Sequence, residues 1–185
     1  MLEDWEKSVE IAYQEGQNLV LIGHSDSHVG QSLWLDVCHG RRDGAPPPVD
    51  LAAEKRAGEL IRRLARESVV SAIHDCSDGG AAVAVAEMAL AANIGMTMTV
   101  VPQISNVGAI LFGEDQGRYI VSTCDPDWVR QLANEAQLFA VEIGLTGGDE
   151  LVFDLVDRGG PQSVTLADLR AAHEGFFPAL MQGEL

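Results

Sequence analysis

Short apolar runs bounded by polar turn residues recur along the chain, a pattern that is typical of buried strands. The runs that predict strands are 18–23 (NLVLIG), 69–73 (VVSAI), 96–101 (MTMTVV) and 117–123 (GRYIVST). Residues 32–37 (SLWLDV) alternate between polar and apolar positions and also have strand character. Residues 139–156 predict two more strands, joined as a hairpin through the glycine-rich turn TGGDE.

Helical spacing of apolar positions occurs between these runs. Asp50 follows the proline-rich segment APPPV and is well placed to cap a helix over residues 51–67. Residues 125–137 (DPDWVRQLANEAQ) begin with an acidic cap and continue as an amphipathic helix. From Thr165 the sequence LADLRAAHEGFFPALM predicts a last helix, which we expect to end near Gly175.

Residues 81–92 predict the most apolar helix of the chain, because apolar side chains surround it on almost every side. A helix of this kind is usually buried, so we expect residues 79–93 to be fully covered, with alanines that permit close approach to a sheet. Helices alternate with strands, and hairpins are mixed in, which indicates an α+β fold with packed helices on a mixed β-sheet. Residues 2–15 fit either an amphipathic helix or a twisted strand.

The turn before this helix, HDCSDGG at residues 74–80, is dense in hydrogen-bonding groups. Gly79 and Gly80 let a backbone approach a ligand closely, and the amides at a helix N-terminus favour phosphate. Asp75 and Asp78 would repel an anion in contact. The conflict is resolved if one aspartate caps the helix and the other holds Mg²⁺ against phosphate oxygens.

The same turn also has a purely structural interpretation. Ser77 or Asp78 would then only cap the buried helix, with His74 hydrogen-bonded to a neighbouring strand. Cys76 lies close to His74 in sequence, but no third group is evident to orient the pair, which disfavours a Cys–His nucleophile. The ligand-facing and the structural interpretations both remain open at this point.

Composition limits the class of protein. The chain has 185 residues, of which 46% are hydrophobic and 22% charged, and it fits one globular domain over residues 1–185. Its net charge of −16 disfavours nucleic-acid binding, because phosphate backbones require concentrated Lys and Arg. No run approaches the roughly 20 apolar residues that span a bilayer.

Two further features indicate the cellular compartment. The N-terminal segment MLEDWEKSVE is acidic and amphipathic, unlike a secretory signal. Cys38, Cys76 and Cys124 are scattered, with no metal-type spacing, and suit free thiols in a reducing cytosol. We therefore expect a cytoplasmic protein that binds neither nucleic acid nor a membrane.

Four motifs occur in order along the chain: GAPPPVDLAAE (44–54), HDCSDGGAAVAVAEMA (74–89), LFGEDQGRYIV (111–121) and LADLRAAHEGFFPALM (166–181). Together they resemble one family, the C-terminal domain of phosphoribosylformylglycinamidine synthase, synthetase component (FGAM synthase subunit II). This family belongs to the AIR synthetase-related superfamily. The resemblance covers essentially the whole chain and implies the α+β fold of the AIR synthetase C-terminal domain.

The resemblance also implies a function in purine biosynthesis, the ATP-dependent conversion of formylglycinamide ribonucleotide to formylglycinamidine ribonucleotide. The family's full chain is several times longer, and this sequence resembles the last of its four domains. The expected partners are therefore the remaining domains of the synthetase chain and a glutaminase subunit that supplies ammonia. Segments matching the family's catalytic histidine and main magnesium ligands are absent, so no catalytic residue is carried over.

The expected cofactors of the whole enzyme are ATP or ADP and Mg²⁺. We expect none of them to be bound tightly by this domain alone, and we expect the isolated domain to be inactive. Two alternatives remain: another enzyme of the AIR synthetase superfamily, or a stand-alone, non-catalytic domain that binds nucleotides or docks to a partner. The motifs GAPPPVDL and FGEDQGR favour FGAM synthase.

The resemblance places the phosphate- or nucleotide-binding residues in two turns. Gln116 is suited to a hydrogen bond with a ribose or base, and Arg118 to pairing with a phosphate or with Glu114. The alternative for this second turn is an acidic loop with an internal salt bridge. Asp75 or Asp78 is the candidate Mg²⁺ ligand. The full candidate set is His74, Asp75, Ser77, Asp78, Gly79, Gly80, Glu114, Asp115, Gln116 and Arg118.

Overall fold

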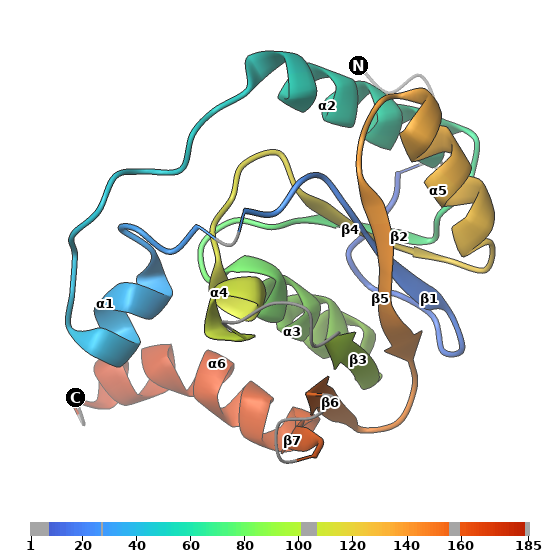
Figure 1. Ribbon diagram of the computed structural model, residues 1–185. Coiled ribbons are helices and arrows are strands. Elements are labelled where there is room, and N and C mark those ends of the chain that lie inside the picture. The colour runs from blue at the N-terminus through green and yellow to red at the C-terminus, as the bar shows by residue number, and fades with distance from the viewer. Residues whose placement is uncertain (1–7, 27, 101–106, 156–159, 184–185) are drawn as a thin grey trace.

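All seven strands in the described part of the chain belong to one mixed sheet (Figure 1). The computed structural model describes residues 8–26, 28–100, 107–155 and 160–183. Along the sheet the strands follow the order β2-β4-β1-β5-β3-β6-β7. Their bounds are β1 Asn18–Ile22, β2 Ala72–Asp75, β3 Met96–Val100, β4 Tyr119–Thr123, β5 Ala140–Thr146, β6 Glu150–Leu155 and β7 Gln162–Thr165.

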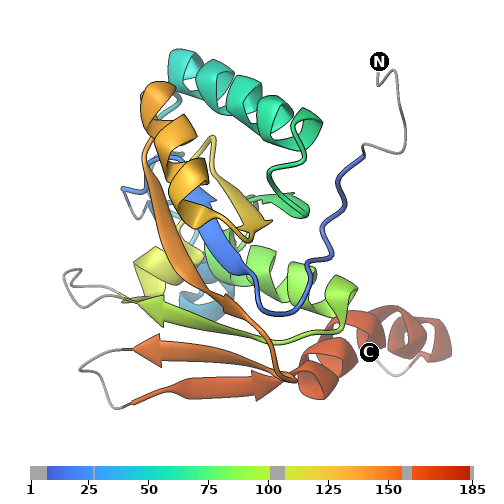
Figure 2. The same ribbon diagram turned by 90° about the vertical axis from the view of Figure 1, so that its right-hand side faces the viewer.

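Helices cover both faces of the sheet. On one face lie α2 (Leu51–Arg66) and α5 (Pro126–Glu135), and on the other lie α3 (Gly80–Ala92), α4 (Val107–Phe112) and α6 (Leu166–Gln182) (Figures 1 and 2). A short helix, α1 (Leu33–His39), follows β1. This arrangement confirms the predicted α+β class with a mixed sheet and packed helices.

Strand β1 divides the core, because its side chains alternate between the two helical layers. Leu19 and Leu21 join the hydrophobic cluster beneath α3, whereas Val20 and Ile22 join the cluster beneath α2 and α5. All four side chains are buried. The antiparallel neighbours β4 and β5 flank β1, so the first strand in sequence lies in the interior of the sheet. The apolar run NLVLIG was therefore correctly predicted as a buried strand.

The predicted hairpin over residues 139–156 is wrong. Both strands form, but β3 lies between them, antiparallel to β5 and parallel to β6. The turn after β5 crosses the start of β3, where the amide of Gly147 donates to the carbonyl of Gly95 over 2.8 Å. Gly144 permits the pairing of β5 with β3, because a Cβ there would lie 2.1 Å from the carbonyl oxygen of Thr97. Glycine spacing alone cannot reveal this inserted strand.

Other element predictions also need correction. Residues 33–39 form a helix rather than a strand, capped by Ser32, whose hydroxyl accepts from the amide of Leu35. The predicted strand at 69–73 begins at Ala72 instead. The last helix continues past Gly175 to Gln182, although Pro178 lies within it.

The N-terminal region of the described chain, residues 8–17, contains no helix and makes one isolated bridge, between Glu10 and Ala72. Residues 2–7 of the predicted 2–15 element lie outside the described part. In contrast, Asp50 caps α2 as predicted, with its carboxylate accepting from the amides of Ala52 and Ala53.

Helix α3 is the most buried helix of the described chain, but its burial is incomplete. Ala81, Ala84 and Ala89 are buried, as expected for alanines that allow close approach to the sheet. Ala91 is exposed, and Glu87 is partly exposed on the same outer side. The prediction of a fully covered helix was therefore too strong: the end of α3 reaches solvent.

We expect Ala84→Leu to lower the free energy of unfolding by roughly 1 to 3 kcal/mol, because a larger side chain would overpack a position that is 3% exposed. Urea denaturation followed by tryptophan fluorescence measures the change. Ala91→Leu is the matched control on the exposed side of the same helix, and it should leave stability almost unchanged. Equal stability of the two variants would contradict this packing of α3.

Candidate functional site

The two turns singled out in the sequence lie side by side at one end of the sheet. Strands β2 and β4 pair antiparallel, with Asp75 opposite Tyr119, so the turn that leaves β2 meets the turn that enters β4. The amide of Cys76 donates to the carbonyl of Arg118 over 2.9 Å and joins the turns. Between them is a cavity of about 190 Å³ lined by Pro47, Cys76, Ser77, Asp78, Glu114 and Gln116.

Glu114 connects the two turns through its carboxylate. One oxygen, Oε1, accepts from the amide of Gly79 over 2.9 Å and from the amide of Leu33 over 2.8 Å. These amides lie at the starts of α3 and α1, where backbone N–H groups lack partners within the helix. Glu114 thus supplies a negative charge at the position where a helix N-terminus favours an anion.

The proposed capping of α3 by Ser77 or Asp78 is not what the structure shows. Gly79 is the N-cap residue, and no side-chain hydrogen bond is made from that position. The Ser77 hydroxyl instead donates to Asp75, and the charge near the helix start comes from Glu114, distant in sequence. The acceptor at the start of α3 belongs to the neighbouring turn, which no pattern within residues 74–80 indicates.

Gly80 allows the close contact between these turns. Its φ is +67°, and a Cβ at this position would lie 2.4 Å from the carbonyl oxygen of Gly113. A side chain larger than hydrogen would therefore push the second turn away from the start of α3. Close backbone approach explains this glycine within the domain, without requiring a ligand.

His74 and Asp75 face α3 and the turn rather than the small cavity. His74 Nε2 lies 2.7 Å from Glu87 Oε2 on α3, and its Nδ1 lies 3.4 Å from Asp75 Oδ1. The hydrogen bond from Ser77 lowers the pKa of Asp75 below its usual value, with His74 adding a smaller contribution. The predicted partner of His74 was a neighbouring strand; the observed partner is a helix.

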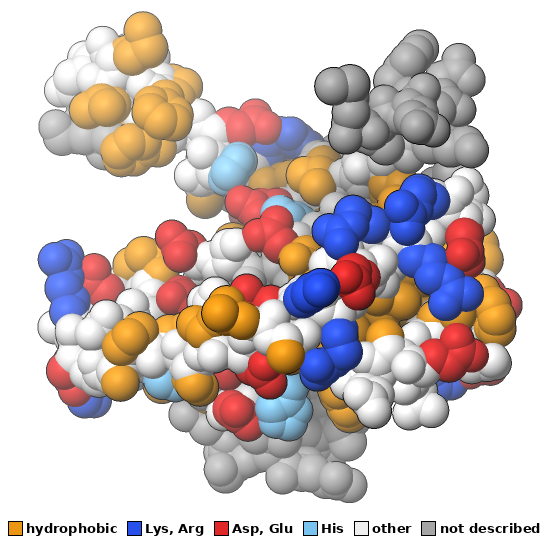
Figure 3. Space-filling view, turned by 90° about the horizontal axis from the view of Figure 1, so that it is seen from above, with side chains coloured by type: hydrophobic (Ala, Val, Ile, Leu, Met, Phe, Trp, Pro, Cys, Tyr) orange, Lys and Arg blue, Asp and Glu red, His pale blue; other side chains and the backbone are white. Residues whose placement is uncertain are grey.

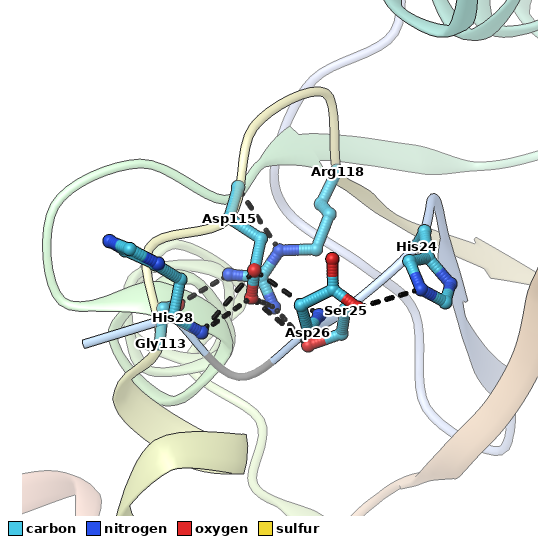
Figure 4. A network of polar contacts seen from close by, with 7 residues as sticks. All are labelled: His24, Ser25, Asp26, His28, Gly113, Asp115 and Arg118. Carbon is cyan, nitrogen blue, oxygen red and sulfur yellow. Dashed lines mark hydrogen bonds and ion pairs between the residues drawn. The ribbon is translucent and has the colours of Figure 1, made fainter. Parts of the chain in front are cut away.

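Arg118 and Asp115 form the rigid base of the second turn (Figure 4). The Arg118 side chain is fully buried and donates to the carbonyls of Asp115 and Gly113 and to the hydroxyl of Ser25. The Asp115 carboxylate lies 3.8 Å from the guanidinium and accepts from Ser25 Oγ and from the amides of Asp26 and His28. Arg118 therefore pairs with Asp115 rather than with Glu114.

A larger cavity, of about 510 Å³, lies on the other side of Gln116. It was not predicted from the sequence, because its walls come from four segments that only the sheet topology brings together. They are the loop after β1, the start of α2, the turn before β4 and the connection from α5 to β5. The lining residues are Gly23, His24, Asp26, Pro48, Val49, Asp50, Ala53, Glu54, Arg56, Asp115, Gln116, Gly117, Gln137, Leu138 and Phe139.

Within the described part of the chain, some polar groups of the larger cavity are already bonded to the protein, and at least one is not. Asp50 and Asp115 are engaged in hydrogen bonds to the protein. Arg56 Nε is buried and lacks a hydrogen-bond partner among the described residues. A ligand with an acceptor for Arg56 and donors for the carboxylates would suit this cavity, and Phe139, 57% exposed, offers an apolar surface beside them.

The described residues do not form a complete Mg²⁺ site. No three His, Cys, Asp or Glu side chains among them gather in a metal-binding arrangement. Asp75 already accepts from Ser77 and contacts His74, whereas Asp78 lines the small cavity. A cation at the small cavity would meet Asp78 in its lining, and its remaining ligands would have to come from outside the described part of the chain.

The fold and the paired turns define the class of protein. The family model of the AIR synthase related protein, C-terminal domain, matches residues 14–155, and the chain belongs to this family. The matched segment includes both turns and both cavities. In the described chain, no helix is long and apolar enough to span a membrane.

Among curated proteins, the chain is similar to phosphoribosylformylglycinamidine synthase subunit PurL. It is 44% identical over 184 residues to PurL of Zymomonas mobilis, covering 98% of this chain and 24% of the relative. It is 42% identical over 188 residues to PurL of Rhodopseudomonas palustris, covering 100% of this chain and 25% of the relative. The chain thus spans about a quarter of the length of the curated relatives it matches.

Solved structures show the same fold. Thermotoga maritima PurL complexed with ATP has a TM-score of 0.71 at 19% identity, covering 89% of this chain and 27% of that chain. Hydrogenase maturation protein HypE in complex with ATP has a TM-score of 0.56 at 14% identity, covering 85% of this chain and 52% of that chain. These likenesses establish the fold and confirm the expected AIR synthetase C-terminal-domain architecture.

We expect Glu114→Ala to lower the free energy of unfolding by about 1 to 3 kcal/mol, because it leaves the amides of Gly79 and Leu33 without their acceptor. Chemical denaturation measures the loss. Glu114→Gln retains an acceptor of the same shape and should cost less than Glu114→Ala. Wild-type stability in both variants would show that the bridge between the turns contributes nothing.

We expect Cys76 to resist thiol reagents at pH 8, because burial raises its pKa to about 11. Exposed Cys38 and Cys124 should react in the native protein, and Cys76 only after unfolding. The pKa of the Cys76 thiol is higher in the folded chain than in the unfolded chain, so deprotonation of this thiol favours unfolding. The free energy of unfolding should therefore fall as the pH rises from about 9 to about 11. A colorimetric thiol titration with and without denaturant counts the reactive groups; three rapid thiols in the native protein would contradict this burial.

Proposed function

We propose that this chain supplies the C-terminal quarter of an ATP-dependent FGAM synthase. The observation that carries the proposal is 41 to 44% identity to PurL subunits along essentially the whole chain. The reaction would convert formylglycinamide ribonucleotide to formylglycinamidine ribonucleotide, with ATP consumed and ammonia delivered by a glutaminase subunit. The remaining domains of the synthetase would be the first partners of this one.

The support for nucleotide binding comes from the two cavities and from the relatives. Structures of Thermotoga maritima PurL are complexed with ATP, with ADP and with FGAR. In this chain, Gln116 borders both cavities, so one ligand could contact the larger cavity with its base and ribose and extend past Gln116 toward the paired turns. We propose that these cavities form one wall of a nucleotide site whose other walls belong to the rest of the synthetase.

The predicted site residues divide into two roles in this proposal. Ser77, Asp78 and Gln116 would face the ligand from the walls of the cavities. Arg118 and Asp115 would hold the turn in position rather than contact phosphate, because their polar atoms already bond to the protein. His74, Asp75, Glu114, Gly79 and Gly80 would hold the first turn against the second and against α3.

Mg²⁺ would enter this site only together with ligands from the other domains. No three metal-binding side chains gather among the described residues, which supports this view. The larger cavity itself is negatively charged, because it presents Asp26, Asp50, Glu54 and Asp115 against one arginine. A bare phosphate would be repelled there, whereas hydroxyl and amino groups of a nucleoside would find acceptors. The chain's own contribution is therefore binding and orientation, and the transfer of phosphate and ammonia would depend on residues that it does not contain.

A chimera tests this function. The 184-residue aligned part of Zymomonas mobilis PurL is replaced with this chain, and the protein is assayed for formation of formylglycinamidine ribonucleotide from ATP, ammonia and substrate. We expect the chimera to be active and to support growth of a synthetase-deficient strain without purines. A folded but inactive chimera would contradict the proposal and favour a stand-alone, non-catalytic domain.

Within an active chimera, Asp78→Asn together with Gln116→Ala tests the two side chains that we place against the ligand. Nucleotide released on denaturation is quantified by chromatography, and we expect at least a tenfold weaker retention. Glu59→Gln together with Gln131→Ala is the control, since these exposed residues line neither the site nor its turns. Unchanged retention in the first variant would assign Asp78 and Gln116 no role in binding.

A further inference from the structure

The end of α6 carries apolar side chains that the described domain does not cover. Phe176, Phe177, Leu180 and Met181 are 53%, 69%, 51% and 88% exposed. In Figure 2 this end of the helix projects past the sheet, and in Figure 3 hydrophobic side chains gather on the projection at the upper left. We call these four residues the α6 tip.

The first half of the same helix is firmly attached. Leu166 is buried, and Leu169 packs against the hydrophobic cluster beneath α3. Arg170 donates through Nη2 to the carbonyl of Leu90 over 2.9 Å and to Asn93 Oδ1 over 3.3 Å, at the end of α3. The α6 tip is therefore carried by a helix whose direction is fixed by the domain.

The tip presents one apolar helical face. Phe176 and Leu180 are four residues apart, as are Phe177 and Met181, so the two pairs form adjacent rows on the helix surface. Residues 175–183 (GFFPALMQG) contain no charged side chain, although the whole chain has a net charge of −16. Such a face suits a hydrophobic groove without charges, and a flexible methionine adapts well to such a surface.

The relatives indicate where such a groove would lie. The family model ends at residue 155, before α6, yet PurL of Rhodopseudomonas palustris aligns with 100% of this chain, α6 included. That alignment covers 25% of the relative. Helix α6 thus has a counterpart in this relative, and the part of the relative outside the alignment is about three times as long as the aligned part.

We propose that the α6 tip docks into an apolar groove on the remaining part of the full-length synthetase chain. This proposal rests on the proposed function. Four side chains that are already partly covered expose less than the roughly 800 Å² per partner of a stable complex between separate proteins. Docking within one chain needs less area, because the linked segment has a high effective concentration. The small area therefore favours this occupant over a second copy of the chain.

Amide hydrogen exchange in the isolated chain and in the chimera tests the docking. We expect the amides of residues 176–182, apart from Pro178, to exchange at least tenfold more slowly in the chimera. Phe177→Gln with Met181→Gln should remove that protection in the chimera and leave the melting temperature of the isolated chain unchanged. His173→Gln, exposed on the same helix but outside the tip, is the control and should alter neither measurement.

The outcomes separate this proposal from the proposed function. An active chimera whose tip amides exchange as fast as in the isolated chain would overturn the docking and leave the function standing. An inactive chimera with protected tip amides would support the docking and contradict the function. If the chimera aggregates, the same exchange measurement on the aligned helix of full-length Zymomonas mobilis PurL decides the question, with rapid exchange overturning the proposal.

Sedimentation of the isolated chain addresses the competing occupant. We expect a monomer at micromolar concentration, for both the wild type and Phe177→Gln with Met181→Gln. A concentration-dependent dimer that this double substitution abolishes would assign the tip to a second copy of the chain and overturn the proposal.

Discussion

The buried guanidinium of Arg118 is the interaction on which the site depends. A fully buried cation is tolerated only when it is paired and hydrogen-bonded, and Arg118 meets both conditions through Asp115, Ser25 and two carbonyls. These contacts fix the loop after β1 and the turn before β4 relative to each other. The turn before β4 also brings Glu114 to the start of α3. One desolvated charge thus orders three segments that are distant in sequence.

The sheet provides the matching constraint on the apolar side. Strand β1 has helices on both faces, and the alternation of its side chains between two hydrophobic clusters leaves little freedom for a change of register. The pairing of β1 with β4 and β5 places three connections at the same end of the sheet: the loop after β1, the turn before β4 and the connection from α5 to β5. The larger cavity is the space among these connections, so its shape follows from strand order.

Some local signals were read correctly from the sequence, whereas residues 33–39 form a helix in place of the expected strand and α6 continues past Gly175. The burial of β1 and the capping of α2 by Asp50 depend on neighbouring residues, and both were predicted. Of the candidate residues, which the family motifs placed in two turns, Ser77, Asp78, Glu114 and Gln116 meet at one cavity, because the pairing of β2 with β4 brings these turns together. The role of Glu114 as a distant cap and the unpaired Arg56 Nε depend on topology, which no local spacing reveals.

The insertion of β3 between β5 and β6 has a consequence for how the chain reaches its native state. Residues 140–155 carry the local signals of a hairpin, and a connection this short favours rapid contact between the two segments in the unfolded chain. The native sheet requires residues 96–100 to occupy the space between them, so any early pairing of these neighbours has to open. A hairpin of β5 and β6 would therefore compete with the native pairing during folding, and Gly144 favours the native one because its lack of a Cβ lets β3 lie beside β5.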